Sequence, residues 1–259
     1  DVIMGGTGNV PQYQICQGPC ESAPPPPPCT QNCFDNVLFL PGIESSRLYR
    51  PQVVGGTEQK LWEPPIGVHD DLHDLYLTPQ GQSIRDDIYT KKGDVIDEMP
   101  ATGSNIYKSF IAKMNDLKTQ GMINDWESAP YDWRLSLDDI LAKGKQTNAN
   151  ISYLDATSTP YIVQELKRLA STSKTGQVTV IAHSAAGLVA KRLTEVLGAD
   201  ASKLIDKMIF VAVPQAGTPE AVTGGLHGYG LDIAKGTVVT RATARAFAST
   251  SNAVSVPKR

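Results

Sequence analysis

The chain has 259 residues, of which 41% are hydrophobic and 20% charged, and its 24 basic and 27 acidic residues give a formal net charge of −3. This balance is typical of a globular protein and excludes a disordered chain or a collagen-like fibre. The small net charge gives no electrostatic reason to expect a nucleic-acid partner or a polybasic membrane contact. No apolar run approaches the roughly 20 residues of a membrane-spanning helix.

The four cysteines flank a run of five prolines near the start of the chain: Cys16, Cys20, Cys29 and Cys33. Two disulfides in an exported arm fit this spacing, with three possible pairings, and a zinc site with four thiolate ligands is the alternative. We favour disulfides, because the rest of the chain has no free thiol to be oxidised. The chain starts at Asp1 without an apolar leader, which fits removal of a signal peptide. We therefore expect a secreted or periplasmic protein with an N-terminal arm over 1–34 that is cross-linked by disulfides.

Apolar patterns beyond the arm predict an α/β fold, with a core over 35–220. Strands are predicted over 36–40, 177–182 and 207–213, and helices from 105 to about 120, from 160 to about 170, and over 187–197. A strand, a helix and a second strand in that order form a right-handed crossover, so the sheet is expected to be mostly parallel. Residues 50–100 are expected to be irregular.

The segment 178–189 carries the strongest chemical signal. A buried strand runs directly into Ser184 and a helix follows at once, which places the hydroxyl on a tight turn at the carboxyl edge of the sheet. The helix N-terminus offers free N–H groups, and the N–H of Ala185 is a candidate oxyanion donor. Ala182 and Ala186 replace the glycines of the usual G-x-S-x-G pattern, so we expect the turn to persist with more strain. Ordinary strand–helix packing is the alternative.

A second oxyanion donor is expected from the loop after the strand at 36–40. Gly42 allows a sharp turn there, and the N–H of Ile43 is the candidate. A plain strand-ending turn is the alternative interpretation.

No histidine is clearly placed to act as the base. His183 adjoins Ser184, and its side chain is expected to point away and pack. A triad of Ser184, Asp206 and His227 is disfavoured because Asp206 precedes a strand, whereas a triad acid follows one.

A metal site is also disfavoured. His69 and His73 are four residues apart among aspartates, but no third-ligand motif accompanies them, and a solvated turn explains them better. We expect no metal and no cofactor.

Several blocks resemble the lecithin:cholesterol acyltransferase-like family of α/β-hydrolases, and they occur in the family's order. They are Leu40-Pro-Gly-Ile-Glu-Ser-Ser-Arg-Leu48, Leu61-Trp62, Asp74-Leu-Tyr-Leu-Thr-Pro-Gln-Gly81, Ala129-Pro-Tyr-Asp-Trp-Arg-Leu135, the turn at Ser184, and Val213-Pro-Gln-Ala-Gly-Thr-Pro219. The resemblance implies an α/β-hydrolase fold, Ser184 as the nucleophile, and Ile43 and Ala185 as oxyanion donors. It also implies ester or acyl-transfer chemistry on lipid-like substrates.

The resemblance makes 221–259 the start of a lid or cap. It implies that the sheet is incomplete in this chain and that the catalytic acid and histidine lie after Arg259, in a C-terminal fragment that stays associated. For the block at 129–135, we expect a structural role in which Asp132 and Arg134 pair and hold a loop.

The sequence thus predicts a secreted serine lipase, esterase or acyltransferase that forms an acyl-Ser184 intermediate. A non-catalytic lipid- or partner-binding module derived from a hydrolase is the main alternative. A deacylase of glycolipid anchors and a peptidase are further alternatives on the same fold.

Overall fold

A computed structural model describes residues 34–51, 58–63, 70–78, 80–99 and 103–218. The predicted disulfides at Cys16, Cys20, Cys29 and Cys33 and the predicted lid over 221–259 lie outside the described residues. His69 and His227 lie outside them as well.

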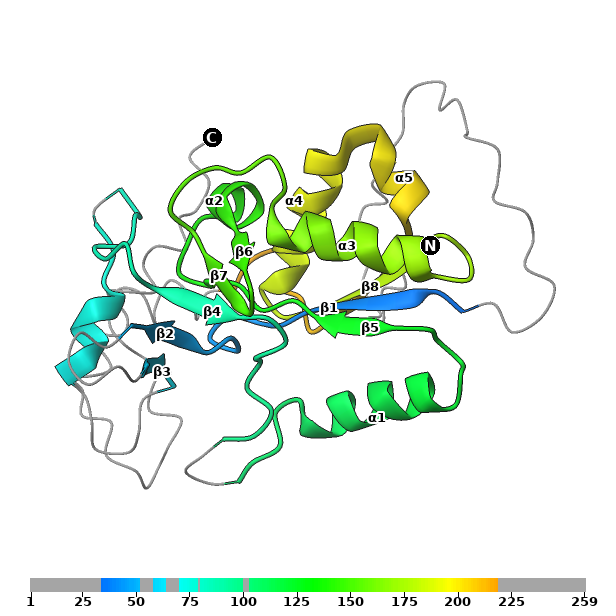
Figure 1. Cartoon of the computed structure of the whole chain (residues 1–259), viewed down its shortest axis with the longest axis horizontal. Coiled ribbons are helices and arrows are strands. Elements are labelled where there is room, and N and C mark those ends of the chain that lie inside the picture. Colours follow the sequence, from blue (N-terminus) through cyan, green and yellow to red (C-terminus); the bar gives the residue numbers. More distant parts are fainter. Residues whose placement is uncertain (1–33, 52–57, 64–69, 79, 100–102, 219–259) are drawn as a thin grey trace.

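A four-stranded parallel sheet forms the centre of the described structure (Figure 1). Its strands, in spatial order, are β5 (Trp126–Ser128), β1 (Asn36–Leu40), β8 (Val178–His183) and β9 (Ile205–Val211). Every neighbouring pair runs parallel. The predicted α/β class is confirmed, and the last predicted strand begins two residues earlier than expected.

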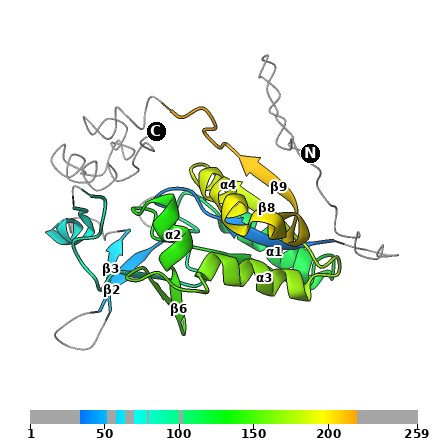
Figure 2. The same ribbon diagram turned by 90° about the horizontal axis from the view of Figure 1, so that it is seen from above.

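Helices cover both faces of this sheet (Figures 1 and 2). On one face lies α1 (Lys108–Thr119). On the other face lie α3 (Tyr161–Thr172) and α4 (Ala186–Leu197), which leads through the short η2 (Gly198–Asp200) and α5 (Ala201–Leu204) into β9.

Strand β1 is buried along its whole length because it packs against both helical layers. Val37 and Phe39 point toward the α1 side, where they join clusters with Met114 and Tyr107. Leu38 and Leu40 belong to the main core on the α3 and α4 side. Continuous burial of this kind explains why β1 has a run of apolar residues rather than an alternating pattern.

A second sheet is antiparallel and was not predicted. Its strands, in spatial order, are β3 (Gln59–Trp62), β2 (Leu48–Arg50), β4 (Tyr89–Lys91), β7 (Asn150–Ser152) and β6 (Lys145–Thr147). The expectation that 50–100 is irregular is wrong in part, since this stretch holds β3, η1 (Asp70–Leu75) and β4. The helix α2 (Leu137–Lys143) leads into β6.

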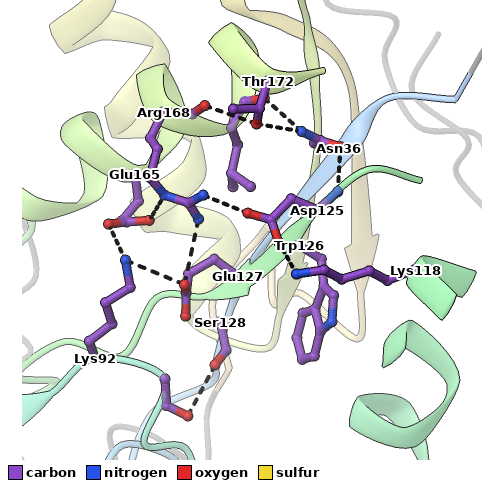
Figure 3. A network of polar contacts seen from close by, with 12 residues as sticks. Asn36, Lys92, Lys118, Asp125, Trp126, Glu127, Ser128, Glu165, Arg168 and Thr172 are labelled. Carbon is purple, nitrogen blue, oxygen red and sulfur yellow. Dashed lines mark hydrogen bonds and ion pairs between the residues drawn. The ribbon is translucent and has the colours of Figure 1, made fainter. Parts of the chain in front are cut away.

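A network of charged side chains joins the two sheets and α3 (Figure 3). Arg168 on α3 pairs with Asp125 at 2.5 Å and with Glu165 at 2.7 Å, and its third carboxylate partner is Glu127 in β5 at 3.5 Å. Lys92, which follows β4, reaches Glu165 at 2.5 Å and Glu127 at 3.4 Å. This network fixes β5, and with it the 129–135 block at its carboxyl end.

Among the residues that the structure describes, no helix has the length and apolar character needed to cross a membrane.

Candidate functional site

Ser184 lies on a strained turn between β8 and α4. Its φ is +54°, a left-handed conformation that costs a side-chain-bearing residue roughly 1–3 kcal/mol. The turn is held from both sides, because the Ser184 N–H donates to the Val211 carbonyl at 2.9 Å and the Gly187 N–H donates to the Ser184 carbonyl at 3.1 Å. Ser184 as a whole residue is only partly buried. The predicted sharp turn is present even though Ala182 and Ala186 occupy the usual glycine positions.

The loop at 41–46 (Pro41-Gly-Ile-Glu-Ser-Ser46, the 41–46 loop below) lies directly against this turn. A methyl group on Gly42 would be 3.1 Å from Ser184 Cβ and 3.0 Å from His183 Nδ1. Such contacts are tighter than ordinary van der Waals packing, so the close approach depends on a residue without a side chain. The structure therefore brings the two predicted oxyanion segments together.

Free N–H groups remain on both segments. Within the described residues, the N–H groups of Ile43, Glu44 and Ala185 have no hydrogen-bond partner. Ala185 precedes the first residue of α4, where unpaired N–H groups and the helix dipole favour negative charge. The arrangement is chemically suited to stabilise an oxyanion formed beside Ser184.

Four aromatic side chains hold the backbone of the 41–46 loop. Trp62 Nε1 donates to the Glu44 carbonyl at 2.6 Å, and Trp133 Nε1 donates to the Ser46 carbonyl at 3.1 Å. The Tyr131 hydroxyl donates to the Pro41 carbonyl at 2.8 Å. On the other side, the Gly42 N–H donates to the Tyr107 hydroxyl at 3.0 Å.

The predicted pairing of Asp132 with Arg134 is confirmed. The guanidinium Nη2 and Nε lie 2.5 and 2.9 Å from the two carboxylate oxygens, and both side chains are buried. Arg134 Nη1 also donates to the Leu75 carbonyl at 3.1 Å, so the pair holds the end of η1. The two aromatic residues of the same block, Tyr131 and Trp133, both donate hydrogen bonds to the 41–46 loop. The block therefore has the structural role expected from the sequence, and sequence reasoning missed only that its two aromatic residues support the 41–46 loop.

His183 packs against Tyr107 rather than serving Ser184. Its Nδ1 lies 2.7 Å from the Tyr107 hydroxyl, and the two rings meet edge to face with centroids 5.6 Å apart. Burial lowers the pKa of His183, which keeps the ring neutral at pH 7. No hydrogen bond joins His183 to Ser184 within the described residues.

Glu44 is the one carboxyl group in the 41–46 loop. It adopts a φ of +63°, and burial raises its pKa from 4.5 to about 7. The cause is loss of water around the charged form, which no cation among the described residues offsets.

Gly187, in the first turn of α4, is a site residue that the sequence pattern did not single out. A methyl group there would be 2.3 Å from Val213 Cγ1, so α4 and the segment after β9 meet at a distance that only glycine permits. The glycine needed for close packing is thus displaced by one position from the usual pattern. The sequence did offer one signal for this role, because Gly187 is the only glycine close to Ser184 along the chain.

The described residues supply no base for Ser184. Asp206 lies at the amino end of β9, where Ile205 is opposite Val178, whereas Ser184 follows the other end, where Val211 is opposite His183. Asp206 and Val211 are five residue steps apart along the extended strand, or about 16 Å. This agrees with the expectation that Asp206 is not the triad acid.

His73 lies in η1, with its ring edge-to-face on Tyr76 at 5.1 Å. Over the described ranges, no group of three or more His, Cys, Asp or Glu side chains is placed to bind a metal ion.

The sequence model of the lecithin:cholesterol acyltransferase family matches residues 78–257, more than half of the chain. No curated protein matches the chain.

Proposed function

The chain belongs to the lecithin:cholesterol acyltransferase family, and we propose that it is a serine ester hydrolase or acyltransferase that works through an acyl-Ser184 intermediate. Membership of this family indicates acyl transfer or hydrolysis on lipids. The serine mechanism rests on one observation: Ser184 is only partly buried on a strained strand–helix turn, with the unpaired N–H groups of Ile43 and Ala185 on the two segments that meet there.

In the proposed first step, the Ser184 hydroxyl oxygen attacks the ester carbonyl carbon and its proton passes to a base. The carbonyl oxygen becomes an oxyanion that accepts hydrogen bonds from the Ile43 and Ala185 N–H groups. The tetrahedral intermediate collapses, the alcohol leaves with the proton, and the acyl group stays on Ser184. Water or a second alcohol then takes the acyl group by the same steps in reverse.

The base and its acid partner are proposed to lie in a further segment of the same protein. Within the described residues, β9 forms an edge of the parallel sheet, and its Ile209 and Val211 side chains are 44% and 46% exposed. An apolar edge strand of this kind is suited to pair with another strand. We propose that the predicted C-terminal fragment pairs there and completes the site.

The direct test is hydrolysis by the full-length protein of p-nitrophenyl esters of increasing chain length, phospholipid vesicles and a peptide panel. Ser184→Ala is expected to abolish ester hydrolysis. Ser202 is an exposed serine in α5, before the amino end of β9, and Ser202→Ala is expected to leave ester hydrolysis unchanged. An added long-chain alcohol or sterol as acceptor separates transfer from hydrolysis. Unchanged ester hydrolysis in Ser184→Ala would refute the serine mechanism.

The lack of a base among the described residues favours a second candidate, a non-catalytic lipid-binding module. That function predicts vesicle binding by the full-length protein without hydrolysis of any ester. Cleavage of peptides in preference to esters would instead support a peptidase.

Export to an oxidising compartment is also proposed, with Cys16, Cys20, Cys29 and Cys33 in two disulfides. The intact mass is expected to rise by the mass of four hydrogen atoms on reduction, because each of the two disulfides gains two electrons and two protons. A mass that falls by one zinc ion when a chelator is added would show the zinc alternative instead.

A further inference from the structure

One buried hydroxyl touches both halves of the candidate site. The Tyr107 hydroxyl accepts a hydrogen bond from the Gly42 N–H at 3.0 Å and lies 2.7 Å from His183 Nδ1. Gly42 immediately precedes Ile43, the proposed donor, and His183 immediately precedes Ser184, the proposed nucleophile. Tyr107 itself comes from a third part of the chain, at the start of α1.

The hydroxyl also lies 3.3 Å from Ser45 Oγ, which in turn lies 3.2 Å from the Ile43 carbonyl. A tyrosine has one proton to donate and two lone pairs. If the proton goes to His183 Nδ1, the hydroxyl still accepts from Gly42. If His183 donates instead, Tyr107 donates to Ser45, and Ser45 to the Ile43 carbonyl. In both cases hydrogen bonds through the Tyr107 hydroxyl connect the 41–46 loop to His183, the residue before Ser184.

Tyr107 is well placed to fix these groups because it is itself held firmly. The ring is 6% exposed and packs edge to face on Phe39 in the central strand β1, with centroids 4.9 Å apart. Its N–H donates to the Asp97 carbonyl at 3.0 Å, and the Asp97 carboxylate pairs with Arg47 just after the 41–46 loop at 3.0 Å. Oxyanion donors act over a narrow range of distances, about 2.7–3.1 Å, so a small movement of the loop weakens them.

We propose that Tyr107 is a positioning residue that sets the distance between the nucleophile and the oxyanion donor at Ile43. The proposal rests on the proposed function, since it assumes that Ser184 attacks and that Ile43 donates. Tyr107 does not touch the reacting atoms and acts through Gly42 and His183. Its removal is therefore predicted to weaken stabilisation of the transition state and to leave substrate binding nearly unchanged.

The test is Tyr107→Phe in the full-length protein, which deletes the hydroxyl and keeps the ring on Phe39. We expect kcat for a p-nitrophenyl ester to fall about tenfold and KM to stay within about twofold. The matched control is Tyr89→Phe, in which the tyrosine is 8% exposed as a whole residue, against 6% for Tyr107, and loses a hydroxyl that donates to Glu58 at 2.6 Å on the antiparallel sheet. Its kcat is expected to be unchanged.

A second readout does not depend on turnover. The ¹⁵N resonances of the His183 ring are expected to report one fixed tautomer in the unmodified protein and to move in Tyr107→Phe but not in Tyr89→Phe. Freely exchanging tautomers in the unmodified protein would overturn the proposal even if Tyr107→Phe failed to fold.

Two kinetic outcomes would overturn the proposal: an unchanged kcat in Tyr107→Phe, or a rise in KM at constant kcat, which would indicate a binding role. Ser184→Ala, measured alongside, separates the two levels of inference. If Ser184→Ala is inactive while Tyr107→Phe is fully active, the positioning role is wrong and the proposed function stands. If Ser184→Ala is itself active, the proposed function is wrong.

Discussion

Replacing Gly42 by alanine tests whether the 41–46 loop faces Ser184 at the described distance. The new methyl group would be 3.0 Å from His183 Nδ1, 3.1 Å from Ser184 Cβ and 3.4 Å from the Tyr107 hydroxyl. The first two contacts are shorter than ordinary packing by a few tenths of an ångström, so the loop and the turn must separate by about that amount. Overpacking of this kind costs about 1–2 kcal/mol of stability.

The catalytic effect of Gly42→Ala should exceed its effect on folding. A displacement of about 1 Å at a reacting centre costs about a hundredfold in rate, so a few tenths of an ångström are expected to lower kcat about tenfold. The assay is p-nitrophenyl ester hydrolysis, paired with thermal unfolding of the same sample. We expect a measurable kcat loss at temperatures where the variant is fully folded.

Gly176→Ala is the matched control, because a methyl group there meets no atom within 4 Å but must adopt a φ of +77°. That strain costs about 1–2 kcal/mol, similar to the cost at Gly42, and lies in the turn before β8, at the opposite end of the strand from Ser184. Its kcat is expected to be unchanged. Equal kcat values for the two variants would refute the described packing of the loop against Ser184.

Three further predictions concern stability. Gly187→Ala should lower the free energy of unfolding by about 2–3 kcal/mol, because the new methyl group would be 2.3 Å from Val213 Cγ1. Adding Val213→Ala should recover part of this loss in urea unfolding, and no recovery would contradict the contact. Arg134→Met should cost about 3–5 kcal/mol, because it leaves the buried Asp132 carboxylate without its cation, and a loss below 1 kcal/mol would show that the pair is not desolvated. Burial raises the pKa of Glu44 to about 7, so the folded state holds this proton more tightly than the unfolded state, and stability should fall as pH rises from about 4.5 to about 7. Glu44→Gln should therefore be more stable than the parent above pH 7, by up to about 3 kcal/mol, and equal to it near pH 4; equal stability at pH 8 would contradict the assignment.

The parallel core was predictable because its elements have strong local patterns. The strand before Ser184 was predicted over 177–182 and is found at Val178–His183, and the next helix was predicted over 187–197 and is found at Ala186–Leu197. Both are long, apolar and bounded by clear signals. The helix predicted from 105 starts later, at Lys108, after a non-helical Tyr107, and Ile106, which the periodic pattern included, is 42% exposed.

The antiparallel sheet was not predictable, because its strands are only three or four residues long and β4, which joins β2 and β3 to the β6–β7 hairpin, gains its partners from distant parts of the chain. Tyr89 in β4, for example, pairs with Ser152 in β7. The short helix α2 was a different case, since its signal was present: Ser136 accepts a hydrogen bond from the Asp139 N–H, and two aspartates occupy the first turn.

The candidate site likewise contains residues that a local sequence motif predicts and one residue that no local motif predicts. Ser184 and Ile43 stand in recognisable local motifs, and the structure brings the segments that carry them together. Tyr107 has no motif, because its place in the site depends on contacts 65 and 76 residues away along the chain, with Gly42 and His183. Contacts of this length arise only when the sheet and α1 are assembled.

Every proposal above requires Ser184 to be a reactive nucleophile in the folded protein. Treatment of the full-length protein with a fluorophosphonate, followed by peptide mass spectrometry, tests this requirement. We expect one modified residue, Ser184, and no modification after unfolding in urea, because reactivity depends on the turn and its N–H groups. A label that maps to another residue, or a Ser184 peptide that stays unmodified in the active protein, would show that Ser184 is not the nucleophile.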